Sequence, residues 1–310
     1  MGEELDLVII GAGAAGLSAA LYAARARVNA VTIERMGVGG QLINIDRVDD
    51  YPGFPSGVAG YELGPQLAEQ AMNAGARIDY GEVNAMEPAG TAWVVSGDGL
   101  EYQCRAVIIA GGSTLARLDV PGEAEFEGRG VSYCATCDGE FFRDREVAVI
   151  GSGDSALDEA EYLSAICSRV HVVHRGTELG AARSLQERAR ASKRISFVPE
   201  TIVESIVGDD GVTAIALREQ AADRSRSLPI SGVFIYVGLK PNSGYLADLL
   251  PLDAGGHIPT DIWMATSVAG IYAAGDIRQH SARQIGSSVG DGVTAAIAVE
   301  RYLRGKRNDG

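Results

Sequence analysis

Short apolar-rich runs that end in glycine are the clearest feature of the hydrophobic pattern of this chain. Residues 5–10 form one such run and residues 146–150 another, and a helix-forming stretch follows the glycines in both places. Short runs of this kind are typical of parallel strands buried on both faces. The pattern therefore predicts two parallel α/β units, one starting near residue 5 and the other near residue 146.

The first unit carries a complete dinucleotide fingerprint. The strand at 5–10 leads into Gly11, Gly13 and Gly16 in the spacing G-x-G-x-x-G, and a helix is predicted from residue 17 to about 24. These glycines permit a tight turn and let backbone amides meet a pyrophosphate at the helix N-terminus. Glu34, at the end of the next predicted strand, is the residue expected to hold ribose hydroxyls.

The second unit repeats this arrangement. A strand at 146–150, a glycine turn, a helix to about residue 166 and a strand at 169–173 follow one another in the same order. Two such units predict two nucleotide sites, as in an enzyme that passes electrons between two carriers. The candidate binding residues of this second site are Gly151, Gly153, Ala156, His174 and Arg175.

Further predicted strands place the second unit inside the first. Residues 106–110 and 232–237 are apolar and end in glycine or proline, so the chain is expected to cross between domains near 115–121 and 239–243. A last strand at 270–274 and a helix from about 290 to 303 return to the first domain. The predicted domains are 1–115 with 242–310, and 116–241, both Rossmann-like and α/β in class; 310 residues suffice for two domains.

Charge excludes some partners. The chain has 27 Lys and Arg against 41 Asp and Glu, for a formal net charge of −14, so neither nucleic acid nor an anionic membrane is an expected partner. No apolar stretch approaches the roughly 20 residues of a membrane span, and no basic secretory leader precedes residue 5. We expect a cytoplasmic protein.

The four cysteines narrow the chemistry. Cys134 and Cys137 form a C-x-x-C pair, whereas Cys104 and Cys167 are isolated. In a reducing compartment such a pair is either metal-binding or redox-active. A metal site needs a second ligand pair, which the isolated cysteines and the four histidines do not supply, so a redox dithiol is favoured and no metal is expected.

The sequence resembles the low-molecular-weight thioredoxin reductases over nearly its whole length. The most specific match is Cys134-Ala-Thr-Cys137-Asp138-Gly139, which has the sequence and position of that family's active-site motif. Other matching segments are residues 39–42, 51–53, 273–276, 283–284 and 290–292. The resemblance implies a homodimer with the fold of the class II pyridine nucleotide-disulfide oxidoreductases, FAD in the first domain and NADPH in the inserted one.

The resemblance also implies roles for single residues. Cys134 would attack the substrate disulfide, Cys137 would contact the flavin, and Asp138 would donate a proton to a thiolate. Asp138 as a simple turn residue is the alternative. FAD would lie on the first glycine loop and Glu34, and its ribityl chain and isoalloxazine would meet Gln41, Asp276, Arg283 and Gln284. Gln41 as a turn cap and Arg283 in a surface ion pair are the alternatives there.

The chain departs from this family where NADPH binds. The family holds the 2′-phosphate with a His-Arg-Arg run and a further arginine. His174 and Arg175 match this run, but Gly176 and Gly180 stand where the other arginines are expected. Three readings follow: NADH as donor, a second FAD fed by an external carrier such as ferredoxin, or ordinary NADPH held by Arg175 and Arg183. An altered donor is favoured.

The leading functional prediction is an FAD-dependent disulfide reductase that passes electrons to thioredoxin or a thioredoxin-like protein. A flavin-dependent dithiol oxidase that uses oxygen is one alternative. A non-enzymatic, nucleotide-bound redox sensor is another, and the complete flavin motif argues against it.

Overall fold

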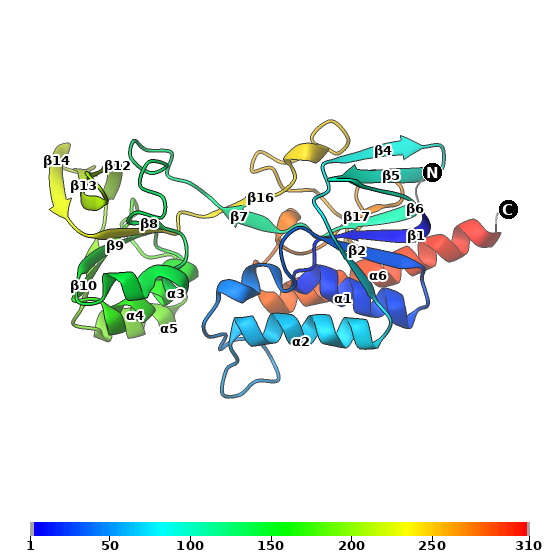
Figure 1. The fold of residues 1–310 in the computed structure, drawn as a ribbon, viewed down its shortest axis with the longest axis horizontal. Helices are drawn as coiled ribbons and strands as arrows, with labels where there is room; N and C mark the ends of the chain where they lie inside the picture. The colour runs from blue at the N-terminus through cyan, green and yellow to red at the C-terminus, as the bar shows by residue number, and fades with distance from the viewer. Residues whose placement is uncertain (1–2, 309–310) are drawn as a thin grey trace. The chain divides into compact units, whose positions relative to one another are not determined.

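The computed structural model describes residues 3–308 and divides into two compact units (Figure 1). One unit contains the residues up to Thr114 and those from Lys240 onward, and the other is Leu115–Leu239. The sequence placed the ends of the inserted domain at 116 and 241, so the two divisions differ by one and two residues.

The first unit is built on a mixed sheet whose strand order is β3-β2-β1-β6-β5-β4, with β17 also paired to β6. Pairing is parallel from β3 to β6 and antiparallel from β6 to β4. The strands are β1 (Glu3–Ile10), β2 (Ala30–Glu34), β3 (Arg77–Tyr80), β4 (Ala85–Ala89), β5 (Ala92–Gly97), β6 (Leu100–Ile109) and β17 (Ile271–Ala273). This confirms the predicted Rossmann-like sheet.

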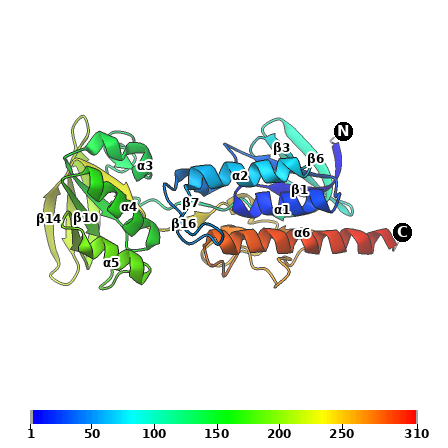
Figure 2. The ribbon, with the colours of Figure 1, turned by 90° about the horizontal axis from the view of Figure 1, so that it is seen from below.

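Helices α1 (Ala14–Arg25), α2 (Gly60–Asn73) and α6 (Ile285–Asn308) lie on one face of this sheet, as Figure 2 shows. Alternate residues of β1 divide between two cores: Leu7 and Ile9 pack with the alanines of α1 and α6, whereas Val8 packs on the opposite face with Trp93 and Leu246. The short helices η1 (Gly40–Asn44), η3 (Gly244–Leu246) and η4 (Gly275–Ile277) complete this unit.

The last helix begins earlier than expected. The sequence suggested a start near residue 290, but α6 starts at Ile285 and includes Gly290 and Gly292. A Cβ at Gly292 would lie 2.0 Å from the carbonyl oxygen of Ala15. This glycine therefore permits close packing of α6 on α1 and does not mark a helix end.

The inserted unit contains a fully parallel sheet of order β11-β10-β9-β15-β8. Helices α4 (Asp154–Ile166) and α5 (Arg183–Ala191) cover one face. An antiparallel sheet of β12 (Thr201–Gly208), β13 (Val212–Glu219) and β14 (Arg224–Pro229) covers the other. The parallel strands are β8 (Val131–Ser132), β9 (Glu146–Ile150), β10 (Arg169–Val173), β11 (Ile195–Val198) and β15 (Gly232–Ile235).

The two chain crossings meet each other. β7 (Ser113–Leu115) and β16 (Leu239–Pro241) pair as a separate two-stranded sheet, and the Ala116 amide donates to the carbonyl of Gly238 at 2.9 Å. The described part of the chain has no helix with the length and apolar character that a membrane crossing requires.

Candidate active site

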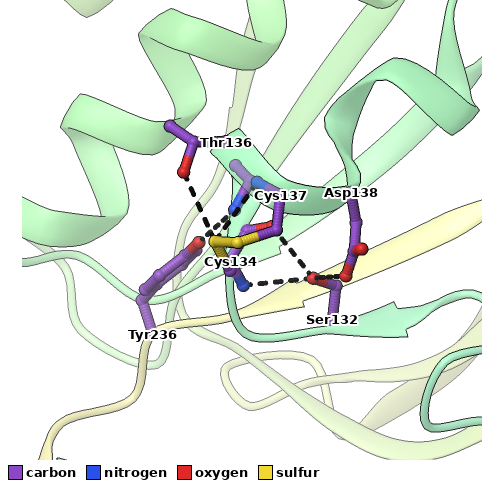
Figure 3. The surroundings of a disulfide bond; sticks show 7 residues. Ser132, Cys134, Thr136, Cys137, Asp138 and Tyr236 are labelled. Carbon is purple, nitrogen blue, oxygen red and sulfur yellow. Dashed lines mark hydrogen bonds between the residues drawn. A yellow bond between two sulfur atoms is a disulfide. The ribbon is translucent and has the colours of Figure 1, made fainter. Parts of the chain in front are cut away.

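Cys134 and Cys137 are joined by a disulfide, with their Cα atoms 5.3 Å apart (Figure 3). Cys134 caps the short helix α3 (Ala135–Asp138), and its Sγ accepts the Cys137 amide at 3.2 Å. The Thr136 hydroxyl lies 3.3 Å from the same sulfur. Once the disulfide is reduced, the Cys137 amide is in place to stabilise a thiolate on Cys134.

Asp138, the predicted acid, lies beside the pair and bonds to a residue that the sequence did not single out. The Ser132 hydroxyl donates to Asp138 Oδ2 at 2.6 Å. The Ser132 hydroxyl oxygen also accepts the Cys134 amide at 3.1 Å. Ser132 is the last residue of β8 and is only 4% exposed. A lone serine in a two-residue strand gives no signal in the sequence that could have identified it.

Tyr236 supports the same loop from the end of β15. Its hydroxyl accepts the Ala135 amide at 3.0 Å, and the side chain is 8% exposed. Burial raises the pKa of this phenol, and the carboxylate of Glu159 raises it further, so the hydroxyl stays neutral. A Cβ at Gly151 would lie 2.2 Å from the Tyr236 carbonyl oxygen. Tyr236 therefore joins the second glycine loop to the dithiol.

The isolated cysteines lie away from this chemistry. Burial raises the pKa of Cys104 to about 12 and that of Cys167 to about 11. Both thiols are therefore protonated at neutral pH, as expected for small core residues. Among the described residues, no group of three or more His, Cys, Asp or Glu side chains could hold a metal ion.

The first glycine loop has the geometry of a pyrophosphate cradle. Gly11 has φ of 100°, and a Cβ at Gly16 would lie 1.8 Å from the Gly11 carbonyl oxygen. At Gly13, by contrast, the nearest atom to such a Cβ would be 3.9 Å away, which leaves open space at the N-terminus of α1. These are the turn, close-packing and phosphate-approach positions of a dinucleotide loop.

The Glu34 side chain is hydrogen-bonded to the first glycine loop. Its Oε2 accepts the Ala12 amide at 2.7 Å, and its Oε1 accepts the Met36 amide at 2.9 Å. The residue is 9% exposed, so its position is fixed by these bonds. The carboxylate thus lies beside the first glycine loop, and its role toward a ribose stays a prediction.

Asp276 and Gln41, two of the four predicted flavin contacts, lie near the start of β7. Gln41 Nε2 donates to the carbonyl of Ser113 at 2.9 Å, and the hydroxyls of Ser281 and Ser288 lie 3.1 and 3.4 Å from Asp276 Oδ1. Burial raises the pKa of Asp276, and these two hydroxyls oppose that effect.

Arg283 and Gln284, the other two predicted flavin contacts, are exposed. Arg283 has φ of 55°, and its Nη2 lies 3.5 Å from His257 Nε2. The Gln284 amide lies 3.3 Å from the Ser287 hydroxyl, just before α6. Both residues therefore follow the η4 segment that carries Asp276.

A buried ion pair ties the η4 segment to α6. Arg278 forms two bonds to Asp291, Nε to Oδ2 at 2.6 Å and Nη2 to Oδ1 at 2.9 Å. Asp291 Oδ2 also accepts the Gly275 amide at 3.1 Å. The 290–292 segment matches the family in sequence, but no sequence pattern pairs Asp291 with Arg278.

The second glycine loop is also formed. Gly151 has φ of 146°, and a Cβ at Gly153 would have no atom within 4 Å, so this loop too leaves room at a helix N-terminus. The stretch after β10 is anchored beside it: the Gly180 amide donates to the Ser152 carbonyl at 2.9 Å, and the Ala182 amide donates to Asp154 Oδ1 at 2.7 Å.

His174 and Arg175 directly follow β10, which ends at Val173, and they differ in environment. Arg175 is exposed, whereas His174 is 5% exposed. Burial lowers the pKa of His174, and the positive charge of Arg190 lowers it further. The imidazole is therefore neutral at pH 7 and contributes little charge to a bound phosphate.

Comparisons with known proteins agree with this geometry. The family model described as pyridine nucleotide-disulphide oxidoreductase matches residues 5–292. The thioredoxin reductase of Treponema pallidum is 40% identical over 303 residues, which cover 98% of each chain.

Two solved structures are also similar. That of Lactococcus lactis thioredoxin reductase in its FR conformation superposes with a TM-score of 0.94 at 39% identity, over 97% of this chain and 99% of that one. A ferredoxin-flavin thioredoxin reductase of Clostridium acetobutylicum aligns over 98% of this chain and all of its own, with 29% identity and a TM-score of 0.55.

The paired glycine loops and the dithiol thus define a flavoprotein disulfide oxidoreductase of the pyridine nucleotide-disulphide class. Within that class, the chain belongs to the low-molecular-weight thioredoxin reductase family. FAD is typical of this family, and the open cradle at Gly13, bounded by Gly11 and Gly16, fits its pyrophosphate.

Gly16→Ala is expected to weaken FAD binding by about 10- to 100-fold, because overpacking of this kind costs about 1–3 kcal/mol. The added methyl cannot share space with the Gly11 carbonyl. Dilution of the purified variant, followed by flavin fluorescence, measures the dissociation constant. Gly37→Ala is the control, since a Cβ there meets nothing within 4 Å. Equal flavin retention by both variants would contradict the assignment of this loop.

Proposed function

We propose that this protein reduces the disulfide of thioredoxin or a thioredoxin-like protein, through FAD and the Cys134–Cys137 pair. The family supports the thioredoxin substrate, since the similar proteins from Treponema pallidum and Lactococcus lactis are both named thioredoxin reductase. The observation that carries the proposal is the disulfide itself, which lies at one end of α3 with an amide, two hydroxyls and a carboxylate around it.

The proposed reaction is a sequence of thiol–disulfide exchanges in which Cys134, Cys137 and Asp138 take part. Bound FAD supplies two electrons from the donor to the disulfide, which becomes a dithiol. The Cys134 thiolate then attacks the substrate disulfide: a Cys134–substrate bond forms, and one substrate sulfur leaves as a thiolate. Cys137 attacks Cys134 next, so the internal disulfide forms again and the second substrate sulfur leaves. Asp138 is the acid that protonates a leaving thiolate.

We further propose that the electron donor is not selected by a 2′-phosphate. Each missing arginine removes a charge-assisted contact, and a hydrogen bond to a charged group contributes about 1.5–3 kcal/mol. His174 is neutral and cannot compensate, so the candidate cations are the exposed Arg175 together with Arg183 and Arg190 of α5, of which Arg190 is close enough to lower the pKa of His174. The similar Clostridium protein is named for ferredoxin, which supports a donor other than NADPH in this fold. NADH and ferredoxin are the candidates, the second with a further FAD in the inserted domain.

Anaerobic titration of the purified flavoprotein with NADPH, NADH and reduced ferredoxin tests the donor. Bleaching of the flavin absorbance by NADH or ferredoxin, at concentrations where NADPH has no effect, is the expected result. Rapid bleaching by micromolar NADPH would refute the altered donor and identify an ordinary NADPH-dependent reductase. The number of flavins per chain in the same sample decides whether a second FAD is held, and gel filtration tests the homodimer that the family implies.

A further inference from the structure

We infer that Ser132 is a positioning residue that holds the acid Asp138 in register with the attacking Cys134. The inference deepens the proposed function and rests on it, because Asp138 is the proton donor only if the dithiol reduces a substrate. Ser132 touches neither sulfur in the described contacts. It acts through the carboxylate of Asp138 and the backbone of Cys134.

One oxygen atom connects the two functional residues. Ser132 Oγ donates to Asp138 Oδ2 at 2.6 Å and accepts from the Cys134 amide at 3.1 Å (Figure 3). The Cys134 carbonyl lies 3.2 Å from the same hydroxyl, but the hydroxyl has only one proton. We assign that proton to the Asp138 carboxyl oxygen, because this contact is the shorter of the two. Ser132 thereby fixes the distance between the acid and the residue that carries the nucleophile.

This hydroxyl lies on a buried, paired strand, whereas the residues that it holds are more exposed. Ser132 is 4% exposed, and its strand is paired in parallel with β15, where Ser132 lies opposite Phe234. Asp138 is half-exposed at the end of a helix of four residues, and Cys137 is exposed. A helix of only four residues has little stability of its own. The buried hydroxyl is therefore the fixed point from which the Asp138 carboxylate is oriented.

Orientation of a proton donor affects the rate more than binding, because the proton moves only in the transition state. Loss of the hydroxyl is expected to lower kcat for thioredoxin reduction by about 10- to 100-fold, the range that corresponds to one hydrogen bond to a charged group. The KM for thioredoxin is expected to stay within twofold, since Ser132 is buried and cannot touch a protein substrate.

The test is a double-mutant cycle on the full-length flavoprotein, with Ser132→Ala, Asp138→Asn and the double variant assayed for thioredoxin reduction. Because Asp138→Asn removes the proton that Ser132 positions, we expect Ser132→Ala to change kcat by less than about threefold in that background. Ser196→Ala is the matched control. Ser196 lies in β11, the opposite edge strand of the same sheet, where its hydroxyl contacts His171 at 2.9 Å.

The outcomes separate the inference from the proposed function. Wild-type kcat for Asp138→Asn would remove the acid role from the proposed function itself. If Asp138→Asn had a lowered kcat and Ser132→Ala a wild-type kcat, the inference would be overturned while the proposed function would stand. Equal losses from Ser132→Ala in both backgrounds would also overturn it, because the effect would then pass through the Cys134 amide only.

A second pair of variants keeps the test valid if Ser132→Ala loses its flavin or does not fold. Ser132→Thr and Ser132→Val have the same shape and differ only by the hydroxyl. We expect the threonine variant to be at least about tenfold faster than the valine variant. Equal rates for the two would overturn the inference.

Discussion

Replacement of Cys134 or Cys137 by serine is expected to lower kcat/KM for thioredoxin reduction by at least about 10⁴-fold, the scale on which a covalent nucleophile contributes. Serine is nearly isosteric but is not ionised at neutral pH, so no thiolate forms and no disulfide can be exchanged. Reduction of the flavin by the electron donor needs neither sulfur and is expected to continue. Stopped-flow absorbance and a thioredoxin-coupled assay measure the two steps separately.

Cys167→Ala is the control for this experiment. Its thiol is buried at the end of α4, in the core of the inserted unit, and burial raises its pKa to about 11. This variant is expected to keep full disulfide reductase activity, with a moderate loss of stability. The proposed function would be refuted if either serine variant reduced thioredoxin at the wild-type rate. If the dithiol substrate itself, rather than an external donor, reduced the wild-type flavin, the oxidase alternative would replace the reductase.

The double variant Gly176→Arg/Gly180→Arg is expected to raise the preference for NADPH over NADH by about 10²- to 10⁴-fold. Each arginine would supply a contact to the 2′-phosphate, and two such contacts at about 1.5–3 kcal/mol give this range. Neither glycine has a positive φ. A Cβ at Gly180 would meet no backbone atom closer than 3.8 Å, whereas at Gly176 it would lie 3.3 Å from the exposed Glu178 carbonyl, which must shift slightly. The ratio of kcat/KM values for the two nucleotides is the measurement.

Two control variants separate the position of the charge from its presence. Gly176→Ala/Gly180→Ala removes the glycines without adding charge and should leave the preference unchanged. Thr177→Arg adds a cation within the same turn but away from the family's arginine positions, and should raise the preference much less than the double arginine variant. If wild-type protein already uses NADPH well and the double arginine variant gains nothing, then Arg175 and Arg183 form a sufficient phosphate site.

The parallel strands were the most predictable part of the fold. The predicted strands at 146–150 and 169–173 have the observed bounds of β9 and β10, because both are short and rich in buried valine, as buried parallel strands are. The antiparallel sheet β12–β14 was not predicted. Its residues alternate between buried and exposed positions, and β14 is largely exposed, so its hydrophobic signal is weak.

In the site, the sequence identified residues whose chemistry is specific and missed those that act by position. Cys134, Cys137 and Asp138 belong to one motif: Cys134 caps α3, and the other two lie in it. Ser132 and Tyr236 meet them from β8 and from the end of β15, which are about one hundred residues apart in the chain. Serine and tyrosine are common in strands and loops, and only the pairing of β8 with β15 brings these two to the dithiol.

The pairing of β7 with β16 has an evolutionary consequence. Because the inserted segment enters and leaves the first unit at adjacent strands, its two ends lie side by side, as in domains that tolerate insertion and transplantation. An ancestor could therefore exchange this whole segment for a homologous one by recombination, without breaking the sheet into which it is spliced. A change of electron donor would then require the exchange of one domain rather than many coordinated mutations.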